Sequence, residues 1–159
     1  MQKVGRRMNA LSLHYYTVKT WDGDKGSATQ FSDKDYYWTL GKCRGIEPVL
    51  KRHCDIMDKY DPERRVSLFV DEWGTWWAQE PGTIDGHLYQ QNTMRDAMVA
   101  ALSLNIFHQY TNRIGMTNIA QVVNVLQAMV MTREDSMFLT PTYHVFRMYM
   151  PHQEALHIP

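Results

Sequence analysis

The stretch that decides the fold is residues 66–77, VSLFVDEWGTWW. Its first five residues, Val66 to Val70, are an uninterrupted run of strand-forming side chains, which is typical of a strand buried on both faces. The run ends abruptly in Asp71, Glu72 and Trp73. Because ligands of parallel α/β proteins meet the carboxyl ends of the strands, this pattern indicates both a fold class and a place for chemistry.

The segments on either side alternate between strand and helix patterns. Residues 10–16 and 114–118 are further strand candidates, and the first of them ends in His14-Tyr15-Tyr16. Helical spacing covers residues 35–60, 88–110 and 142–150, with a break or kink expected at Pro48 and a start at Pro141. The apolar stretch 119–131 carries embedded amides. The order of strand, helix, strand, helix, strand, helix predicts βαβ units and a parallel sheet, and so an α/β fold.

The composition argues against nucleic acid and membranes as partners. The chain has 159 residues, 44% hydrophobic and 21% charged, which fits one ordinary globular domain. Seventeen Lys and Arg balance seventeen Asp and Glu, so the chain lacks the basic surface that nucleic acid or an anionic membrane would select. No apolar run approaches the roughly 20 residues of a membrane span. We interpret Cys43 and Cys54 as buried thiols, with one disulfide as the alternative.

Polar groups follow all three predicted strands, at the edge where parallel sheets bind their ligands. They are His14 to Tyr16, Asp71 to Trp73, and Asn118 to Gln121. A carboxylate framed by tryptophan can act as a nucleophile toward an oxocarbenium-like centre, because aromatic walls exclude water and neighbouring donors keep it ionised. A structural reading stays open for each group, since a carboxylate could cap a loop or pair with an arginine and a histidine could belong to a satisfied network.

Neither a metal nor a phosphate site is predicted. The seven histidines include no His-x-x-x-His pair on one expected helix. The sequence also has no Gly-rich phosphate loop and no Gly-x-Ser-x-Gly elbow. We therefore expect no metal and no cofactor.

Three motifs, in this order along the chain, resemble those of the α-L-arabinofuranosidases of glycoside hydrolase family 51. Residues 71–76 (DEWGTW) resemble the family's nucleophile motif, residues 11–17 (LSLHYYT) its preceding strand-end motif, and residues 118–125 (NIAQVVNV) its last-strand motif. The similarity runs over nearly the whole chain. It implies a partial (β/α)8 TIM barrel, roughly the last three βα units. Residues 1–150 would be this portion of the barrel, and residues 151–159 would begin the link to a β-sandwich domain.

The resemblance also implies roles for individual residues. Glu72 would be the catalytic nucleophile of a retaining hydrolase that releases terminal α-L-arabinofuranose from arabinan, arabinoxylan or their oligosaccharides. His14 and Tyr16 would orient Glu72 and touch the arabinose. Trp76 would wall the sugar pocket, and Gln121 would bind a sugar hydroxyl. Relatives often assemble as hexamers, so the resemblance implies a homo-oligomer for the complete protein.

One departure from the family pattern decides what to expect of the chain by itself. The family's acid/base glutamate follows an asparagine, and the sequence contains no Asn-Glu dipeptide. We therefore expect an incomplete piece of the enzyme that is inactive alone. Two alternatives stay open: another clan-related glycosidase, such as an endoglucanase or β-xylosidase, and a non-catalytic truncated remnant.

Asp71 is the competitor of Glu72 for the nucleophile's role. Successive side chains on an extended strand point to opposite faces. Only one of the two is therefore expected to reach His14 and Tyr16. The resemblance selects Glu72, which leaves Asp71 facing the surrounding shell, held by a backbone amide or an arginine.

Overall fold

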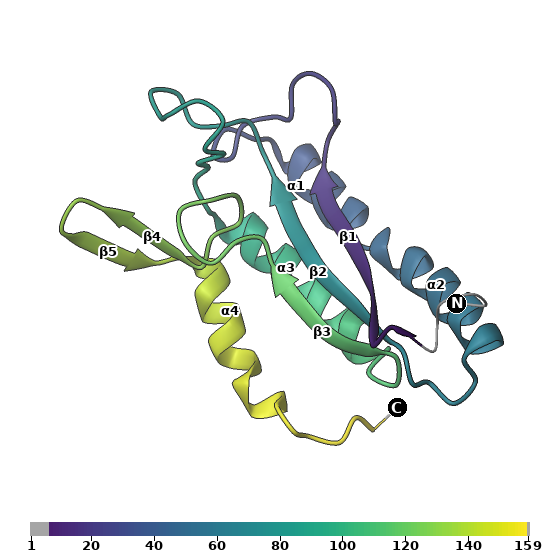
Figure 1. The fold of residues 1–159 in the computed structure, drawn as a ribbon. Coiled ribbons are helices and arrows are strands. Elements are labelled where there is room, and N and C mark those ends of the chain that lie inside the picture. Colours follow the sequence, from purple (N-terminus) through teal and green to yellow (C-terminus); the bar gives the residue numbers. More distant parts are fainter. Residues whose placement is uncertain (1–6, 159) are drawn as a thin grey trace.

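A three-stranded parallel sheet organises the chain in the computed structural model, which describes residues 7–158 (Figure 1). The strands are β1 (Ala10–Val18), β2 (Ser67–Trp76) and β3 (Ile114–Ile119). They pair in the order β1-β2-β3, so the run that begins near Val66 is the central strand. The prediction of an α/β fold with a parallel sheet is confirmed.

The first helical segment is two helices, α1 (Asp33–Cys43) and α2 (Ile46–Tyr60). Ser32 caps α1 and exchanges hydrogen bonds with Asp35 in a capping box. The break lies at Gly45 and not at Pro48, where it was expected. A Cβ at Gly45 would stand 2.6 Å from the Tyr15 hydroxyl, so only glycine fits there. Pro48 lies in the first turn of α2, where its missing N–H is not needed.

The second half of the chain differs more from its sequence pattern. Helix α3 runs over Met94–His108 instead of starting at Leu88, because Thr93 caps it in a second capping box with Asp96. Residues 120–129 form an irregular loop, followed by an antiparallel hairpin of β4 (Val130–Arg133) and β5 (Ser136–Leu139). Helix α4 (Pro141–Tyr149) begins at Pro141 as predicted and continues into a short 3-10 turn, Met150–His152.

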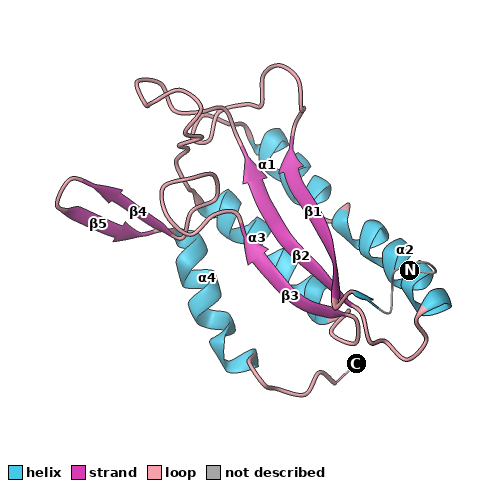
Figure 2. Cartoon of the chain, viewed as in Figure 1, coloured by secondary structure: helices cyan, strands magenta, loops and turns pink. Residues whose placement is uncertain are grey.

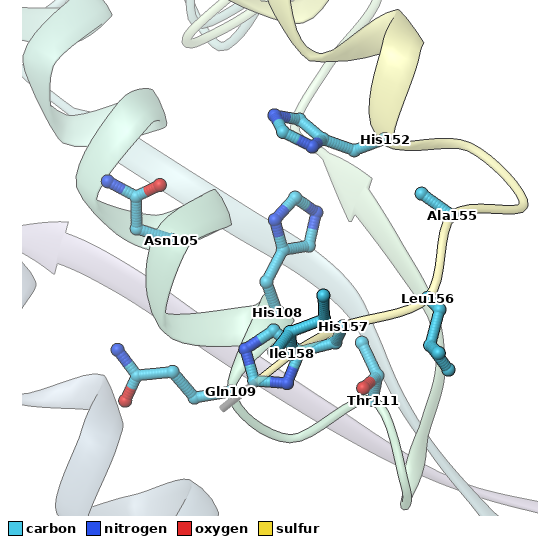
Figure 3. A pocket seen from close by; sticks show the side chains of 9 residues that line it. All are labelled: Asn105, His108, Gln109, Thr111, His152, Ala155, Leu156, His157 and Ile158. Atoms are coloured by element: carbon cyan, nitrogen blue, oxygen red, sulfur yellow. The ribbon is translucent and has the colours of Figure 1, made fainter.

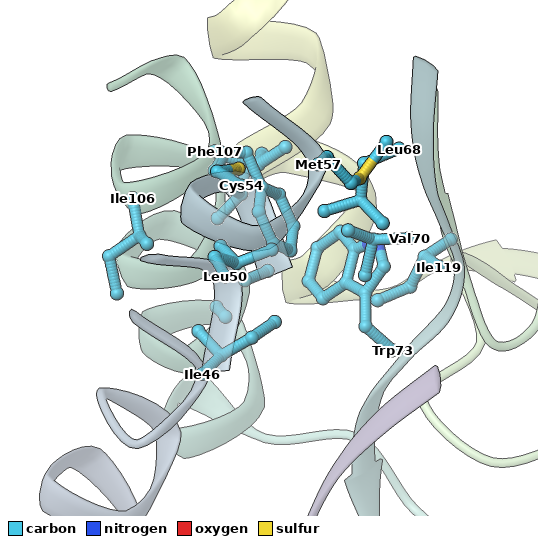
Figure 4. Close-up of a cluster of buried hydrophobic side chains, with 14 of the residues drawn as sticks. Ile46, Leu50, Cys54, Met57, Leu68, Val70, Trp73, Ile106, Phe107 and Ile119 are labelled. Carbon is cyan, nitrogen blue, oxygen red and sulfur yellow. The ribbon is translucent and has the colours of Figure 1, made fainter. Parts of the chain in front are cut away.

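The core lies between the sheet and its helices (Figure 4). Leu68, Val70 and Trp73 of β2 are almost fully buried there. Trp73 meets Phe107 of α3 edge-on, at 5.2 Å between ring centroids, and stacks on Phe146 of α4 at 6.0 Å. Burial of such large aromatic and aliphatic side chains is the main stabilising contribution to a domain of this size.

The helices all lie on one side of the sheet (Figures 1 and 2). In the part of the chain that the structure describes, the opposite face carries no helix and leaves Ser12, His14 and Met116 exposed. None of the helices among residues 7–158 is long and apolar enough to cross a membrane. Cys43 and Cys54 are buried and free, so the reading as buried thiols is confirmed.

Candidate active site

The ends of β1 and β2 bring three of the predicted site residues together. His14 pairs with Glu72 in the strand register, and Tyr16 pairs with Gly74. The Tyr16 hydroxyl donates a hydrogen bond of 2.8 Å to Glu72 Oε2. His14 Nδ1 lies 3.4 Å from the same oxygen. Both side chains from β1 thus contact one oxygen of the Glu72 carboxylate.

The expectation for Asp71 is wrong. Its Oδ1 accepts a 2.8 Å hydrogen bond from the Ser12 hydroxyl and lies 3.2 Å from His14 Nε2. The reason is a bulge. Between the pairs Ser12–Phe69 and His14–Glu72, β1 advances two residues and β2 advances three. An extra residue in one strand breaks the alternation of faces, so Asp71 and Glu72 both contact His14.

The carboxylates are accessible while their tyrosine donor is buried. The side chains of His14, Asp71 and Glu72 are 50%, 32% and 42% exposed. Tyr16 is almost fully buried. Burial, and then the hydrogen bond to Glu72 and its charge, raise the pKa of the Tyr16 hydroxyl well above its usual range. The hydroxyl therefore remains a proton donor to Glu72 over the whole working range of pH.

Aromatic rings adjoin Tyr16, the residue that donates to Glu72, on the side of the loop that follows β1. Trp76, at the end of β2, meets the Tyr16 ring at 5.1 Å and the Trp21 ring at 5.8 Å, both edge-on. Lys25 Nζ lies 5.7 Å from the centre of the Trp76 ring and donates to the Trp21 carbonyl. Trp21 is 60% exposed. The sequence analysis missed Trp21 and Lys25, although an aromatic and a cation just after a polar strand end are a readable signal.

A buried polar network holds the end of β2 in place. Gln127 accepts a hydrogen bond from the backbone N–H of Thr75 at 2.8 Å and donates one to the Asp96 carbonyl at 2.7 Å. The Asp96 carboxylate accepts from the Thr75 hydroxyl and from the Trp77 indole. Gly74 has a φ of +142°, and a Cβ there would stand 3.1 Å from Gln127 Oε1. Sequence reasoning had no means to pair these residues, which are up to 52 positions apart.

Three further polar or aromatic side chains lie near this edge of the sheet. Trp77 is 4% exposed, and the Arg95 guanidinium lies 3.7 Å from the centre of its ring, so the indole has a structural partner. Gln121 follows β3 and has an exposed side chain. Its neighbour Ala120 packs in one cluster with Tyr16 and Trp76, which places Gln121 at the same edge of the sheet. The Asn124 amide bonds to Thr132, at the hairpin, and so has a structural partner.

A further cavity lies elsewhere (Figure 3). It measures about 580 Å³ and contains His108, His152 and His157 among its lining residues. It adjoins the C-terminal end of α3, close to the start of β3 and away from the carboxyl ends of the strands. Among residues 7–158, no group of three or more His, Cys, Asp or Glu side chains is arranged to hold a metal ion.

Comparisons with known proteins agree with this geometry. A family model for the α-L-arabinofuranosidase C-terminal domain matches residues 71–159. An intracellular exo-α-L-arabinofuranosidase of Bacteroides ovatus is 64% identical over all 159 residues, which span 31% of that relative. The crystal structure of the GH51 arabinofuranosidase from Xanthomonas axonopodis pv. citri matches with a TM-score of 0.93 and 51% identity, over 96% of this chain and 31% of that one.

A more distant structure carries the same fold. The α-L-arabinofuranosidase of Thermotoga maritima, solved with arabinose, matches with a TM-score of 0.61 at 22% identity, over 95% of this chain and 28% of that one. This likeness concerns the fold alone. The family match and the two closer relatives confirm the resemblance found in the sequence motifs. The chain belongs to the α-L-arabinofuranosidase family.

Proposed function

We propose that this chain is the nucleophile-bearing part of a retaining α-L-arabinofuranosidase, and that Glu72 is the nucleophile. The observation that supports this proposal is the set of contacts that the Glu72 carboxylate makes. Tyr16 and His14 both contact Oε2, which holds the group in one orientation. Oε1 makes no hydrogen bond to the described residues and is the oxygen that can attack.

The architecture supports a place within a larger barrel. The three parallel strands, with helices on one face only, correspond in the proposal to the last three βα units of a (β/α)8 barrel. Residues 1–150 then belong to the barrel, and residues 151–159 begin the link to a further domain. The bare face with Ser12 and His14 would line the inside of the barrel, where the side chains of the other strands cover it.

The proposed reaction has two steps. Glu72 Oε1 attacks the anomeric carbon of a terminal arabinofuranose as the bond to the leaving oxygen breaks, and a carboxylic acid gives that oxygen a proton. Water then hydrolyses the glycosyl ester and restores the carboxylate. The sequence offers no Asn-Glu dipeptide, so the acid/base carboxylate is proposed to lie outside residues 1–159.

The proposed substrate is supported by the names of the relatives and by two exposed or partly exposed indole rings, Trp21 and Trp76. The Bacteroides ovatus relative is named an intracellular exo-acting enzyme, which supports terminal arabinofuranose on oligosaccharides as the substrate. Trp76 and Trp21 lie against each other and against Tyr16, and apolar ring faces of this kind stack on the C–H faces of sugars. Gln121, which follows β3 at the same end of the sheet, is proposed to bind a sugar hydroxyl.

The proposal is tested in a chimera, in which residues 1–159 replace the matching stretch of the Bacteroides ovatus relative. The chimera should hydrolyse p-nitrophenyl α-L-arabinofuranoside with retention and leave the corresponding xyloside and glucan nearly untouched. Glu72→Ala should lose several orders of magnitude in rate, and azide should restore turnover and yield an arabinofuranosyl azide, because a small anion fits the space left by the carboxylate. Near-normal turnover by Glu72→Ala would contradict the proposal.

A further inference from the structure

Four side chains form a continuous series across the ends of β1 and β2. The Ser12 hydroxyl donates to Asp71 Oδ1 at 2.8 Å, and His14 Nε2 lies 3.2 Å from that same oxygen. On the other side of the imidazole, Nδ1 lies 3.4 Å from Glu72 Oε2. The imidazole of His14 therefore stands between two carboxylates, one on each ring nitrogen.

This placement joins the two carboxylates through one ring. Because Asp71 Oδ1 and Glu72 Oε2 lie against opposite nitrogens of His14, any displacement of the imidazole changes both contacts. The Ser12 hydroxyl ties Asp71 to β1, which fixes the carboxylate on the Nε2 side of the ring.

We propose that Asp71 is a positioning residue that acts on the nucleophile through His14. The inference rests on the proposed role of Glu72. Asp71 holds the ring from its Nε2 side, so that Nδ1 stays beside Glu72 Oε2. Ser12 holds Asp71 in turn. The other ionisable groups that line the hollow beside His14 are Lys19, Lys42 and the hydroxyls of Tyr15 and Tyr16.

The contacts of Asp71 lie within the site. A carboxylate that only caps a strand end would bond a backbone amide, and one that stabilises the fold would pair with an arginine. Asp71 Oδ1 instead contacts only Ser12 and His14 among the described residues. Both come from β1, and one of them contacts the proposed nucleophile.

The arrangement has a consequence for the catalytic cycle. Glu72 becomes part of a glycosyl ester in the intermediate, so its contact with His14 changes during the cycle. Asp71 takes no part in that bond and keeps its own contact with the ring. His14 therefore remains in place during the covalent step, and the carboxylate that hydrolysis restores lies against the same ring.

A double-mutant cycle in the chimera tests the inference. Asp71→Asn keeps the size of the side chain and removes its charge, and His14→Gln removes the ring. Residues in direct contact are coupled, so Asp71→Asn should lower kcat by roughly 2- to 100-fold with little change in KM. In a His14→Gln background the same substitution should cost little further, because residues that act through one another are not additive.

The split between kcat and KM gives a second readout that a structural role would not move. With an activated aryl arabinofuranoside the leaving group departs without a proton, so the acid carboxylate does not limit the rate. The loss in Asp71→Asn should then still appear in kcat, because the position of the nucleophile is what changes. Asp85→Asn, in an exposed loop, is the matched control and should leave kcat and KM unchanged.

Two outcomes would overturn the inference. One is an equal loss of kcat from Asp71→Asn in the presence and in the absence of His14, with His14→Asn as a second variant if His14→Gln fails to fold. The other is a lower midpoint of thermal unfolding with an unchanged kcat. Failure of the proposed function looks different, because Glu72→Ala would then retain turnover whatever Asp71 does.

Discussion

The hydroxyl of Tyr16 lies 2.8 Å from Glu72 Oε2 and joins the ends of β1 and β2. Tyr16 pairs in the strand register with Gly74, two residues beyond Glu72. The hydrogen bond therefore runs back along β2 to the carboxylate. It orients the proposed nucleophile and supplies a donor whose burial keeps it protonated.

Replacing Tyr16 by phenylalanine should slow the reaction and leave the fold in place. The ring contacts with Trp76 survive this change, and only the donor to Glu72 is lost. A hydrogen bond to a charged group contributes about 1.5–3 kcal/mol, so kcat of the chimera should fall by roughly 10- to 100-fold. Steady-state kinetics and the thermal unfolding midpoint measure both effects. A Tyr16→Phe variant with full kcat would show that Tyr16 does not orient the nucleophile.

Replacing Trp76 by alanine should weaken binding of the sugar. The indole lies beside Tyr16, and its loss opens the proposed wall of the arabinose pocket. Aromatic contacts contribute about 0.5–1.5 kcal/mol beyond the area they bury, so KM for the aryl arabinofuranoside should rise by roughly threefold or more. Trp38→Ala is the control, because Trp38 is a half-exposed indole on α1. Equal values of KM for both variants would argue against Trp76 as the wall.

The isolated 159-residue chain should hydrolyse no arabinofuranoside measurably. General acid catalysis contributes about 10²- to 10⁴-fold, and the chain has no Asn-Glu dipeptide to supply the acid. The pocket also lacks its opposite wall, since one face of the sheet is bare within residues 7–158. Release of p-nitrophenol by the purified chain, abolished by Glu72→Ala, would contradict this prediction.

The isolated chain should also fold poorly. Strands β1 and β3 are both edges of the parallel sheet, and unpaired edges promote association with other chains. Met116 adds exposed apolar surface on the bare face. We expect oligomers or aggregates by analytical ultracentrifugation and a broad thermal transition by circular dichroism. A monomer with one cooperative transition would disprove the expectation, whereas the chimera should show such a transition.

Acid should remove a contribution to stability made by Asp61. The backbone N–H of Val66 and then the Arg113 guanidinium hold the pKa of the Asp61 carboxyl below its usual range. A lowered pKa in the folded state stabilises the fold above the unfolded value, about 3.9, and this stability is lost as the pH falls through the lower folded value. Asp61→Asn should therefore destabilise the chimera at neutral pH, and its deficit in urea unfolding should shrink below about pH 4. A deficit independent of pH would exclude this explanation.

The sequence predicted the framework well, because its signals are local. The alternation of apolar runs with helical spacing was enough to predict the parallel sheet, and Pro141 was enough to predict where α4 begins. The proximity of His14, Tyr16 and Glu72 was also predictable, since the carboxyl ends of adjacent parallel strands meet at one edge.

The features that the sequence did not predict depend on contacts between segments, which a linear pattern does not show. The bulge in β2 depends on how two strands pair, and it reversed the expectation for Asp71. The hydrogen bonds of Gln127 to Thr75 and Asp96 join segments far apart in the chain, so its role as a support was invisible. The hairpin of β4 and β5 lacks the Asn-Gly or Asp-Gly turn that marks hairpins in sequence.

For protein engineers, the extra residue in β2 sets a limit on stabilising this scaffold by regularising its backbone. Removing one residue between Phe69 and Glu72 would give an ideal strand, which ordinary design rules favour. Such an ideal strand would also send Asp71 and Glu72 to opposite faces of the sheet. A more regular strand would thus separate the two carboxylates that now both contact the His14 imidazole. Redesign of this strand should therefore keep the bulge.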